Sequence, residues 1–289
     1  MKSLFKTVAI IGKYSSGSES SNIELQLLEL AQYLTQKQIN IFIEAKTHQS
    51  GKFQAFKSIV LEEIGTKANL AIVVGGDGTM LGVARSLINF DIPLIGVNQG
   101  RFGFLADLNI SNMLKSIDEI FQGSSYEDKR MLLHSKIFRG STCIHESLAL
   151  NDVVVRSGSR LIELEVFING SFVHKQRSDG LIVTTPTGTT AYALSAGGPI
   201  LHPELEAIAI VPISPHTLTN RPIAVSSQSI IEIHVVSMDE SYLSIDGQLK
   251  IPLEIHDRVE IKRAEKMITL LHPKDYCYFE MLRKKLNWG

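Results

Sequence analysis

The first 128 residues alternate between short apolar runs and stretches in which apolar residues recur every three or four positions. The runs predict buried strands, and the recurring positions predict amphipathic helices. The predicted strands are residues 7–11, 40–45, 70–74 and 92–97, and the predicted helices are residues 23–36, 53–67, 79–89 and 111–121. A polar Ser/Gly loop is expected at residues 13–22. Strands that alternate with helices indicate a Rossmann-like α/β domain with a parallel sheet.

After residue 129 the pattern changes to short β-rich runs separated by turns. These runs are residues 132–138, 148–156, 161–168, 171–176, 181–185, 207–213, 229–236, 242–245 and 258–263. Asn169-Gly170 and Asp246-Gly247 are typical of hairpin turns, and residues 275–286 have the pattern of an amphipathic helix. We therefore expect an α/β domain at residues 1–128, a β-sandwich domain at residues 129–270, and a final helix at residues 271–289 that packs back on the first domain.

The strand predicted at residues 70–74 leads into Gly75-Gly76-Asp77-Gly78-Thr79 and then into a helical pattern. Glycines allow close approach of the backbone to a ligand, and a helix N-terminus attracts phosphate, so Gly75, Gly76, Gly78 and Thr79 are candidate phosphate-binding residues. Asp77 is unusual there, because a carboxylate repels phosphate. It is either a general base for a hydroxyl that attacks a phosphoryl group, or a cap of the following helix.

Residues 98–107, NQGRFGFLAD, follow the next predicted strand and should border the same edge of the sheet. Phe104 could stack on a base there or belong to the core. Asn151-Asp152 interrupts the apolar run LALNDVVV, which indicates either a bulge or edge of a strand or a site for two vicinal hydroxyls.

Residues 185–192, TPTGTTAY, form a hydroxyl-rich segment with Pro and Gly. Its hydroxyls and N–H groups could hold sugar and phosphate oxygens, or the segment could be an ordinary turn. Arg177 and Asp179 place opposite charges before it, either as part of a site or as a surface ion pair.

Composition excludes several classes of function. The net charge of −1 and the pI of about 6.8 offer no basic surface for nucleic acid or anionic membranes. No apolar run approaches the roughly 20 residues that span a bilayer, and the start of the chain has no signal-peptide cleavage site. Two cysteines without a C-x-x-C pair fit the cytoplasm, and nine scattered histidines make a zinc site unexpected.

Together these segments resemble the NAD kinases of the bacterial type, within the GGDGT group that also contains diacylglycerol kinases and 6-phosphofructokinases. Residues 75–79 match the motif of the group, and Asn151-Asp152 matches the family's pair of Asn followed by an acid, often Glu. Residues 179–180 and 185–192 match its threonine/glycine motif, and residues 98–105 resemble its N-x-G-x-L-G-F-L segment. These matches follow the family order along nearly the whole chain.

The resemblance implies transfer of the γ-phosphoryl group of ATP to the 2′-hydroxyl of the adenosine ribose of NAD, which gives NADP, with Asp77 as the general base. It further implies that Asn151 and Asp152 bind ribose hydroxyls, that Tyr192 is a stacking surface, and that Arg177 faces the phosphates. The implied NAD site comprises Asp77, Gly78, Phe104, Asn151, Asp152, Arg160, Arg177, Asp179, Thr190, Ala191, Tyr192, Ser195 and Gln248.

The resemblance also bears on cofactors and partners. Mg²⁺ is expected to arrive with ATP and to bridge its phosphates, without a dedicated carboxylate cage in the protein. The family tends to form homodimers or homotetramers. Two alternatives remain at this stage: a lipid or sugar kinase of the GGDGT group with a different acceptor, and a non-enzymatic sensor that binds NAD without turnover.

Overall fold

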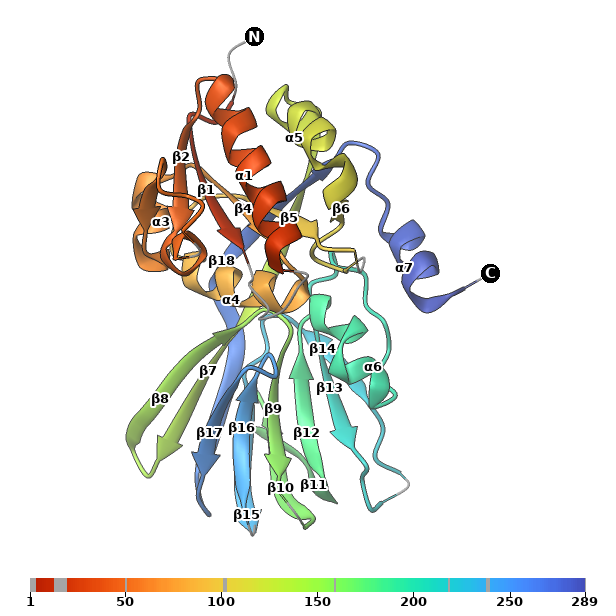
Figure 1. Cartoon of the computed structure of the whole chain (residues 1–289). Helices are drawn as coiled ribbons and strands as arrows, with labels where there is room; N and C mark the ends of the chain where they lie inside the picture. The colour runs from red at the N-terminus through yellow and green to blue at the C-terminus, as the bar shows by residue number, and fades with distance from the viewer. Residues whose placement is uncertain are drawn as a thin grey trace. The chain divides into compact units, whose positions relative to one another are not determined.

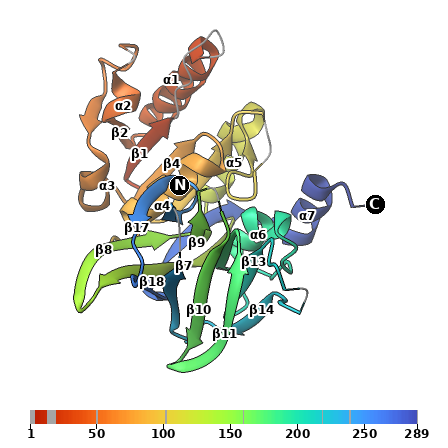
Figure 2. The same cartoon turned by 90° about the horizontal axis from the view of Figure 1, so that it is seen from below.

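Two compact units make up the chain, the first from residues 1–129 with 268–289 and the second from residues 130–267. The computed structural model describes residues 4–12, 20–49, 51–100, 103–158, 160–217, 219–237 and 240–288. Two long strands, β7 (Ser125–Arg139) and β18 (Arg258–Pro273), begin in one unit and end in the other. Figures 1 and 2 show the elements of each unit from two directions.

The first unit is built on parallel strands in the order β3-β2-β1-β4-β5. The bounds are β1 (Thr7–Gly12), β2 (Asn40–Glu44), β3 (Lys57–Ile59), β4 (Leu70–Val74) and β5 (Leu94–Asn98). The last part of β18 and the short β6 (Leu108–Asn109) both pair with β5 in parallel. Because β4 and β5 are parallel neighbours, the segments that follow them leave the same edge of the sheet.

Helices cover this sheet and supply its core. α1 (Ser20–Gln36) lies along β1 (Figure 1), and its Leu27, Leu30 and Leu34 are fully buried. They share one core cluster with strand residues and with Ile117 of α5 (Met113–Phe121), which follows a 3-10 turn. α3 (Leu61–Lys67) and α4 (Asp77–Leu87) contact each other, and α7 (Tyr278–Leu286) belongs to the same unit. The apolar stripe of α1 is therefore buried against the sheet, as its spacing predicts.

The single helix predicted over residues 53–67 is wrong in its first half. The structure has turns up to residue 56, then β3, and only then α3; the short α2 (Ala45–His48) precedes them. Two of the three β3 residues are exposed, and Phe53 is buried from within a turn, so no strand pattern stands out in this sequence. Of the predicted loop at 13–22, residues 20–22 belong to α1, and residues 13–19 lie outside the described residues.

The second unit is a sandwich of two layers of strands, and neighbouring strands within each layer pair antiparallel. One sheet has the order β14 (Ile223–Ser226), β13 (Ala207–Ile213), β12 (Gly180–Thr184), β9 (Asp152–Ser157), β16 (Ser241–Ile245) and β17 (Leu249–Leu253). The other contains β11 (Ser171–Ser178), β10 (Ile162–Ile168), β15 (Ile231–Ser237), β18, β7 and β8 (Thr142–Ala149). Val155 and Val183 of the first sheet meet Val166 and Ile233 of the second in one buried cluster. The α/β plus β-sandwich fold class predicted from the sequence is confirmed.

Strands β8, β14 and β17 were not expected from the sequence, and all three lie at sheet edges. Their residues are mostly exposed or half-buried, so they lack the apolar alternation that marks a strand. Both predicted hairpins are confirmed. Asn169 and Gly170 have φ of 51° and 75°, and Asp246 and Gly247 have φ of 49° and 66°. Positive φ at both positions is what Asn-Gly and Asp-Gly supply.

The outer face of the six-stranded sheet is covered by α6 (Tyr192–Ser195), which follows a 3-10 turn at Thr187–Thr190. Ala193 of α6 is fully buried in a cluster with Val154, Ile182 and Val211. This packing fixes the hydroxyl-rich segment against β9 and β12. Among the residues that the structure describes, no helix has the length and apolar character needed to cross a bilayer.

Candidate functional site

The glycine turn after β4 exposes backbone at the start of α4. Gly75 is anchored because its N–H donates to Val97 O of β5 at 2.8 Å. Gly76 is the N-cap of α4 and is exposed, and a Cβ built on it would meet nothing within 4 Å. Thr79 N–H donates back to Gly76 O at 2.9 Å, which closes the first turn. A helix N-terminus with open space before it suits a phosphate group.

Asp77 does not cap its own helix. It is the first residue of α4, and its carboxylate instead accepts three backbone hydrogen bonds from the segment after β5. Phe104 N–H donates to Oδ2 at 2.9 Å, and Leu105 and Ala106 N–H donate to Oδ1 at 3.0 and 3.2 Å. Of the two interpretations left open by the sequence, a helix cap is thus not the role that the structure gives this carboxylate. Its half-buried position at the turn fits a group aimed at a ligand.

The segment that holds Asp77 is itself packed tightly. A Cβ on Gly103 would lie 2.1 Å from Asp77 Oδ1, so only glycine fits beside the carboxylate. Asn98 is buried and donates through Nδ2 to Leu108 O at 2.9 Å, which closes the base of the loop. The ring of Phe104 is half-buried with Lys285 of α7 at 5.6 Å from its centroid. Phe102 of the same segment lies outside the described residues.

A pocket of about 380 Å³ opens in the second unit beside β9 and β16. Its lining includes four residues of the predicted NAD site, namely Asn151, Asp152, Ala191 and Tyr192. The others are Val154, Arg156, Tyr242, Ser244, Asp246, Gly247 and Lys250. The polar pair that interrupts the apolar run therefore faces a cavity, which is what a site for ribose hydroxyls requires.

Two carboxylates govern the electrostatics of this pocket. Asp246 in the β16–β17 turn accepts the N–H of Asn151 at 2.8 Å and of Asp152 at 3.1 Å on Oδ1, and the N–H of Leu150 at 3.1 Å on Oδ2. Asp152 is only 4% exposed. Its burial, together with the nearby charge of Asp246, raises its pKa to about 7. At neutral pH this carboxyl can therefore either donate or accept a hydrogen bond to a sugar hydroxyl.

The pocket also carries two cations that sequence reasoning missed. Arg156 lies 5.7 Å from the ring centroid of Tyr192, and Lys250 lies 5.0 Å from that of Tyr242. The period of two along β9 could have identified Arg156, because it follows Asp152 at an even spacing and so shares its face. Positive charge beside two aromatic rings suits a ligand with both bases and phosphates.

The hydroxyls of the threonine/glycine segment are largely occupied by the protein. Thr185 Oγ1 donates to Leu150 O at 2.6 Å, Thr189 Oγ1 to Pro186 O at 2.6 Å, and Thr190 Oγ1 to Thr187 O at 3.1 Å. The bond from Thr185 ties the segment to the residues just before β9, and the other two bonds lie within the segment. A Cβ on Gly188 would lie 2.3 Å from Asn151 O, so glycine permits this approach. The segment thus positions the Asn151-Asp152 pair.

Six residues of the predicted NAD site lie in the second unit but do not line this pocket: Arg160, Arg177, Asp179, Thr190, Ser195 and Gln248. Arg177 lies on β11 with its Nε 3.5 Å from Glu163 Oε1, and its side chain is 58% exposed. Asp179 lies directly before β12, and its N–H donates to Ile213 O of β13 at 3.0 Å. Their roles toward NAD stay predictions from the resemblance.

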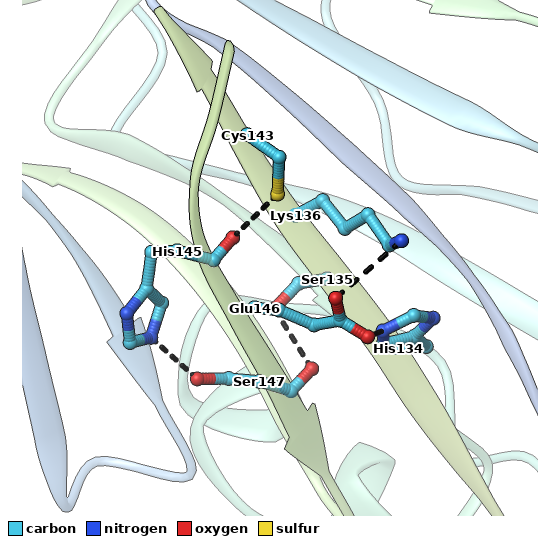
Figure 3. A network of polar contacts seen from close by, with 7 residues as sticks. All are labelled: His134, Ser135, Lys136, Cys143, His145, Glu146 and Ser147. Carbon is cyan, nitrogen blue, oxygen red and sulfur yellow. Dashed lines mark hydrogen bonds and ion pairs between the residues drawn. The ribbon is translucent and has the colours of Figure 1, made fainter.

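A further polar network lies on the β7–β8 hairpin (Figure 3). Glu146 contacts His134 at 2.6 Å and Lys136 at 3.4 Å, and His145 Nε2 lies 2.6 Å from Ser147 Oγ. The carboxylate of Glu146 thus faces His134 rather than the His145–Ser147 pair. These contacts join side chains at exposed and half-buried positions of the two strands, so they stabilise the hairpin. None of the residues involved belongs to the predicted site.

Comparison with known families decides between the possibilities left by the sequence. Residues 11–125 match the model of the ATP-NAD kinase N-terminal domain, and residues 150–272 match that of the ATP-NAD kinase C-terminal domain. The chain belongs to the NAD kinase family. The GGDGT turn lies within the N-terminal match, and the Asn151-Asp152 pair lies within the C-terminal match.

Known NAD kinases match over the full length. The NAD kinase of Thiobacillus denitrificans is 47% identical over 287 residues, covering 99% of this chain and 98% of that protein. The NAD kinase of Nitrosomonas europaea is 47% identical over 288 residues, covering 99% and 96%. The resemblance drawn from the sequence is confirmed, and a lipid or sugar kinase is not favoured.

Solved structures share the fold. Yeast NADH kinase complexed with NADH superposes with a TM-score of 0.87 at 24% identity, over 98% of this chain and 88% of that one. An NAD kinase from Archaeoglobus fulgidus in complex with ATP gives a TM-score of 0.70 at 23% identity, over 98% and 100%. At this identity the likeness supports the NAD kinase fold.

Proposed function

We propose that this protein is an ATP-dependent NAD kinase that phosphorylates the 2′-hydroxyl of the adenosine ribose of NAD and so makes NADP. The observation that carries the proposal is the placement of Asp77. Its carboxylate stands at an exposed glycine turn and helix N-terminus, and three backbone N–H groups hold it in one orientation. A fixed carboxylate beside a phosphate-binding helix end is the arrangement that hydroxyl phosphorylation needs.

In the proposed reaction the 2′-hydroxyl oxygen attacks the γ-phosphorus of ATP. Asp77 takes the hydroxyl proton, the bond from the γ-phosphorus to the bridging oxygen breaks, and ADP leaves with that oxygen. The N-terminus of α4, reached through Gly75, Gly76, Gly78 and Thr79, stabilises phosphate oxygens through N–H groups and the helix dipole. Positioning and neutralisation of charge supply most of the acceleration in phosphoryl transfer.

The pocket of the second unit supplies recognition of NAD. Asn151 and Asp152 bind the ribose hydroxyls, and Tyr192 offers a face for stacking. Arg156 and Lys250 add positive charge for the pyrophosphate, since both line the same pocket. Because Asp152 is buried, a ligand that lacks a ribose hydroxyl leaves this carboxyl without that partner, which disfavours its binding.

Mg²⁺ enters as part of the substrate MgATP and neutralises charge on the phosphates. Within the described ranges, no group of three or more His, Cys, Asp or Glu side chains is arranged to hold a metal ion. We expect the ion to keep several waters and to be carried by the nucleotide. We also propose a cytoplasmic location, from the cysteine usage, and a homodimer or homotetramer, from family membership.

Asp77→Asn tests the proposal directly. We expect turnover to fall by at least about 10²-fold, the usual contribution of a general base, while NAD affinity stays within a few-fold. Asp91→Asn, an exposed carboxyl of the same unit, is the matched control and should be fully active. Product formation is followed by mass spectrometry with NAD, a sugar and a diacylglycerol as separate acceptors.

Three outcomes would contradict the proposal. Near-normal turnover of Asp77→Asn would remove Asp77 as the base. Phosphorylation of the sugar or the lipid instead of NAD would assign another member of the GGDGT group. NAD binding by calorimetry without any NADP from the unmodified protein would indicate a sensor.

A further inference from the structure

A buried histidine lies between two carboxylates in the first unit, near the end of β18. His272 is 1% exposed, its Nδ1 lies 2.9 Å from Asp107 Oδ2, and its Nε2 lies 3.4 Å from Asp128 Oδ2 of β7. Both carboxylate side chains are also nearly buried, at 7% and 5% exposed. Nothing in the GGDGT turn or in the NAD pocket requires such a cluster, so it calls for its own explanation.

The cluster favours a positively charged imidazole. Its Nδ1 forms a hydrogen bond with Asp107, and its Nε2 lies at ion-pair distance from Asp128, so negative charge faces both ring nitrogens. Burial by itself lowers the pKa of His272, but the contacts with Asp107 and Asp128 outweigh it and raise the pKa above its usual value. Among the described residues, two aromatic rings also face the imidazole: Tyr276 stacks on it with centroids 4.0 Å apart, and Tyr126 lies at 6.5 Å.

Asp107 connects this cluster to the catalytic turn through the backbone. It directly follows Phe104, Leu105 and Ala106, the three residues whose N–H groups hold the carboxylate of Asp77. Beyond Asp107 the chain enters β6, which pairs with β5. The amides that orient Asp77 are thus fixed on one side by the β5–β6 pairing and by the contact between Asp107 and His272.

The same segment has little room to move. A Cβ on Gly96 of β5 would lie 2.5 Å from Leu105 O and 2.8 Å from Ala106 Cα, so the segment lies flat against the strand. Gly103 N–H donates to Ala106 O at 3.1 Å, which closes a tight turn beside Asp77. The cation of Lys285 on α7 lies over the ring of Phe104. Two residues near the end of the sequence, His272 and Lys285, therefore contact the segment that carries the amides.

We propose that His272 is a positioning residue for the phosphoryl transfer: by holding Asp107 it fixes the 104–106 amides, and these aim the carboxylate of Asp77. The proposal rests on the proposed function of Asp77 as the base. It differs from a purely structural role, because loss of the contact should misplace a reacting group without changing the NAD pocket, which is formed by other residues of the second unit. A misplacement of about 1 Å can cost roughly 10²-fold in rate.

Two substitutions of His272 separate these roles. His272→Phe keeps a ring that can stack on Tyr276 but removes both polar contacts, and its kcat should fall by about 10- to 100-fold with KM for NAD and ATP within about 3-fold. His272→Asn keeps an amide donor near the place of Nδ1, so its kcat should recover to within about 3-fold of the unmodified enzyme. Rates are expressed per NAD-binding site, determined by calorimetric titration, so that loss of folded protein does not count as loss of kcat.

The pH profile provides a second readout that also covers a His272→Phe protein that fails to fold. In the unmodified enzyme, kcat should fall by about 3-fold or less as pH rises, because the ring loses its charge but keeps one N–H toward Asp107, whereas His272→Asn should lack this fall. His48→Phe is the matched control, because His48 lies in the same unit and bonds Phe56 O rather than the Asp107 segment. It is expected to lose stability and to keep kcat.

The outcomes divide as follows. Unchanged kcat per site in His272→Phe, or an identical alkaline fall in His272→Asn and the unmodified enzyme, overturns the positioning role. A rise in KM for NAD that accounts for the whole loss of kcat/KM overturns it as well. An unmodified protein that makes no NADP overturns the proposed function and this inference with it, whereas an active enzyme with an unaffected His272→Phe variant overturns only the inference.

Discussion

The buried carboxyl of Asp152 makes the stability of this protein depend on pH in a direction that can be worked out. Its pKa is about 7 in the folded protein and ordinarily 3.8, so the folded state binds this proton more tightly than the unfolded state does. The free energy of unfolding should therefore fall as pH rises from about 4 to about 7. With about 1.4 kcal/mol per pKa unit, ionised Asp152 costs on the order of 4 kcal/mol above pH 7.

Asp152→Asn removes this cost, because the amide has a similar shape and no charge to bury. At pH 8 the variant should be more stable than the unmodified protein by a few kcal/mol, and at pH 4 the two should be nearly equal. Urea unfolding followed by far-UV circular dichroism at pH 4, 5, 6, 7 and 8 measures the difference. Glu265→Gln, which neutralises an exposed carboxyl of the same unit, should show no such trend.

The decisive measurement is how the difference in free energy of unfolding between Asp152→Asn and the unmodified protein changes with pH. A stability gain in Asp152→Asn that stays constant from pH 4 to pH 8 would show that Asp152 does not titrate in this range. A variant that is less stable than the unmodified protein at pH 8 would show that the ionised carboxylate makes favourable contacts. Either result would refute the argument that burial and the charge of Asp246 raise the pKa of Asp152.

Three other substitutions have defined outcomes. Gly103→Ala places a Cβ 2.1 Å from Asp77 Oδ1 and should lower kcat by about 10-fold or more with NAD affinity unchanged, as steady-state kinetics can measure. Asn151→Ala should weaken NAD binding by about 1–3 kcal/mol, which calorimetric titration would detect. Leu27→Ala, at a fully buried position of α1, should lower the free energy of unfolding by about 2–5 kcal/mol in urea titrations while the remaining folded protein keeps its kcat.

The central elements could be predicted from sequence because their local signals agree with their tertiary setting. Strand β4 is apolar at all five positions and is buried at all five, so its run of Val, Ile and Leu needs no partner to be recognised. The Asn169-Gly170 turn is defined by the positive φ that these two residues adopt readily. Edge strands such as β14 and β17 carry no comparable signal. Each pairs with only one neighbouring strand and is partly exposed, so polar residues are tolerated along it.

The candidate site was predictable only where a residue breaks a local pattern. Asp77 stands out in a glycine turn, and Asn151-Asp152 stands out in an apolar strand. Asp246 does not, because Asp before Gly is an ordinary turn residue; its three bonds to the N–H groups of residues 150–152 exist only in the fold. The pairing of His272 with Asp107 spans 165 positions, so no window of sequence could reveal it.

The three amides on Asp77 also determine which of its oxygens can act as the base. A carboxylate has about four lone-pair sites, two on each oxygen. Oδ1 accepts the N–H groups of Leu105 and Ala106, so its sites are filled, whereas Oδ2 accepts only the N–H of Phe104 among the described residues. The remaining site on Oδ2 is the one that can receive the proton of the acceptor hydroxyl. Amides suit this task better than a lysine would, because they fix the carboxylate without adding a formal charge that would form an ion pair at that site.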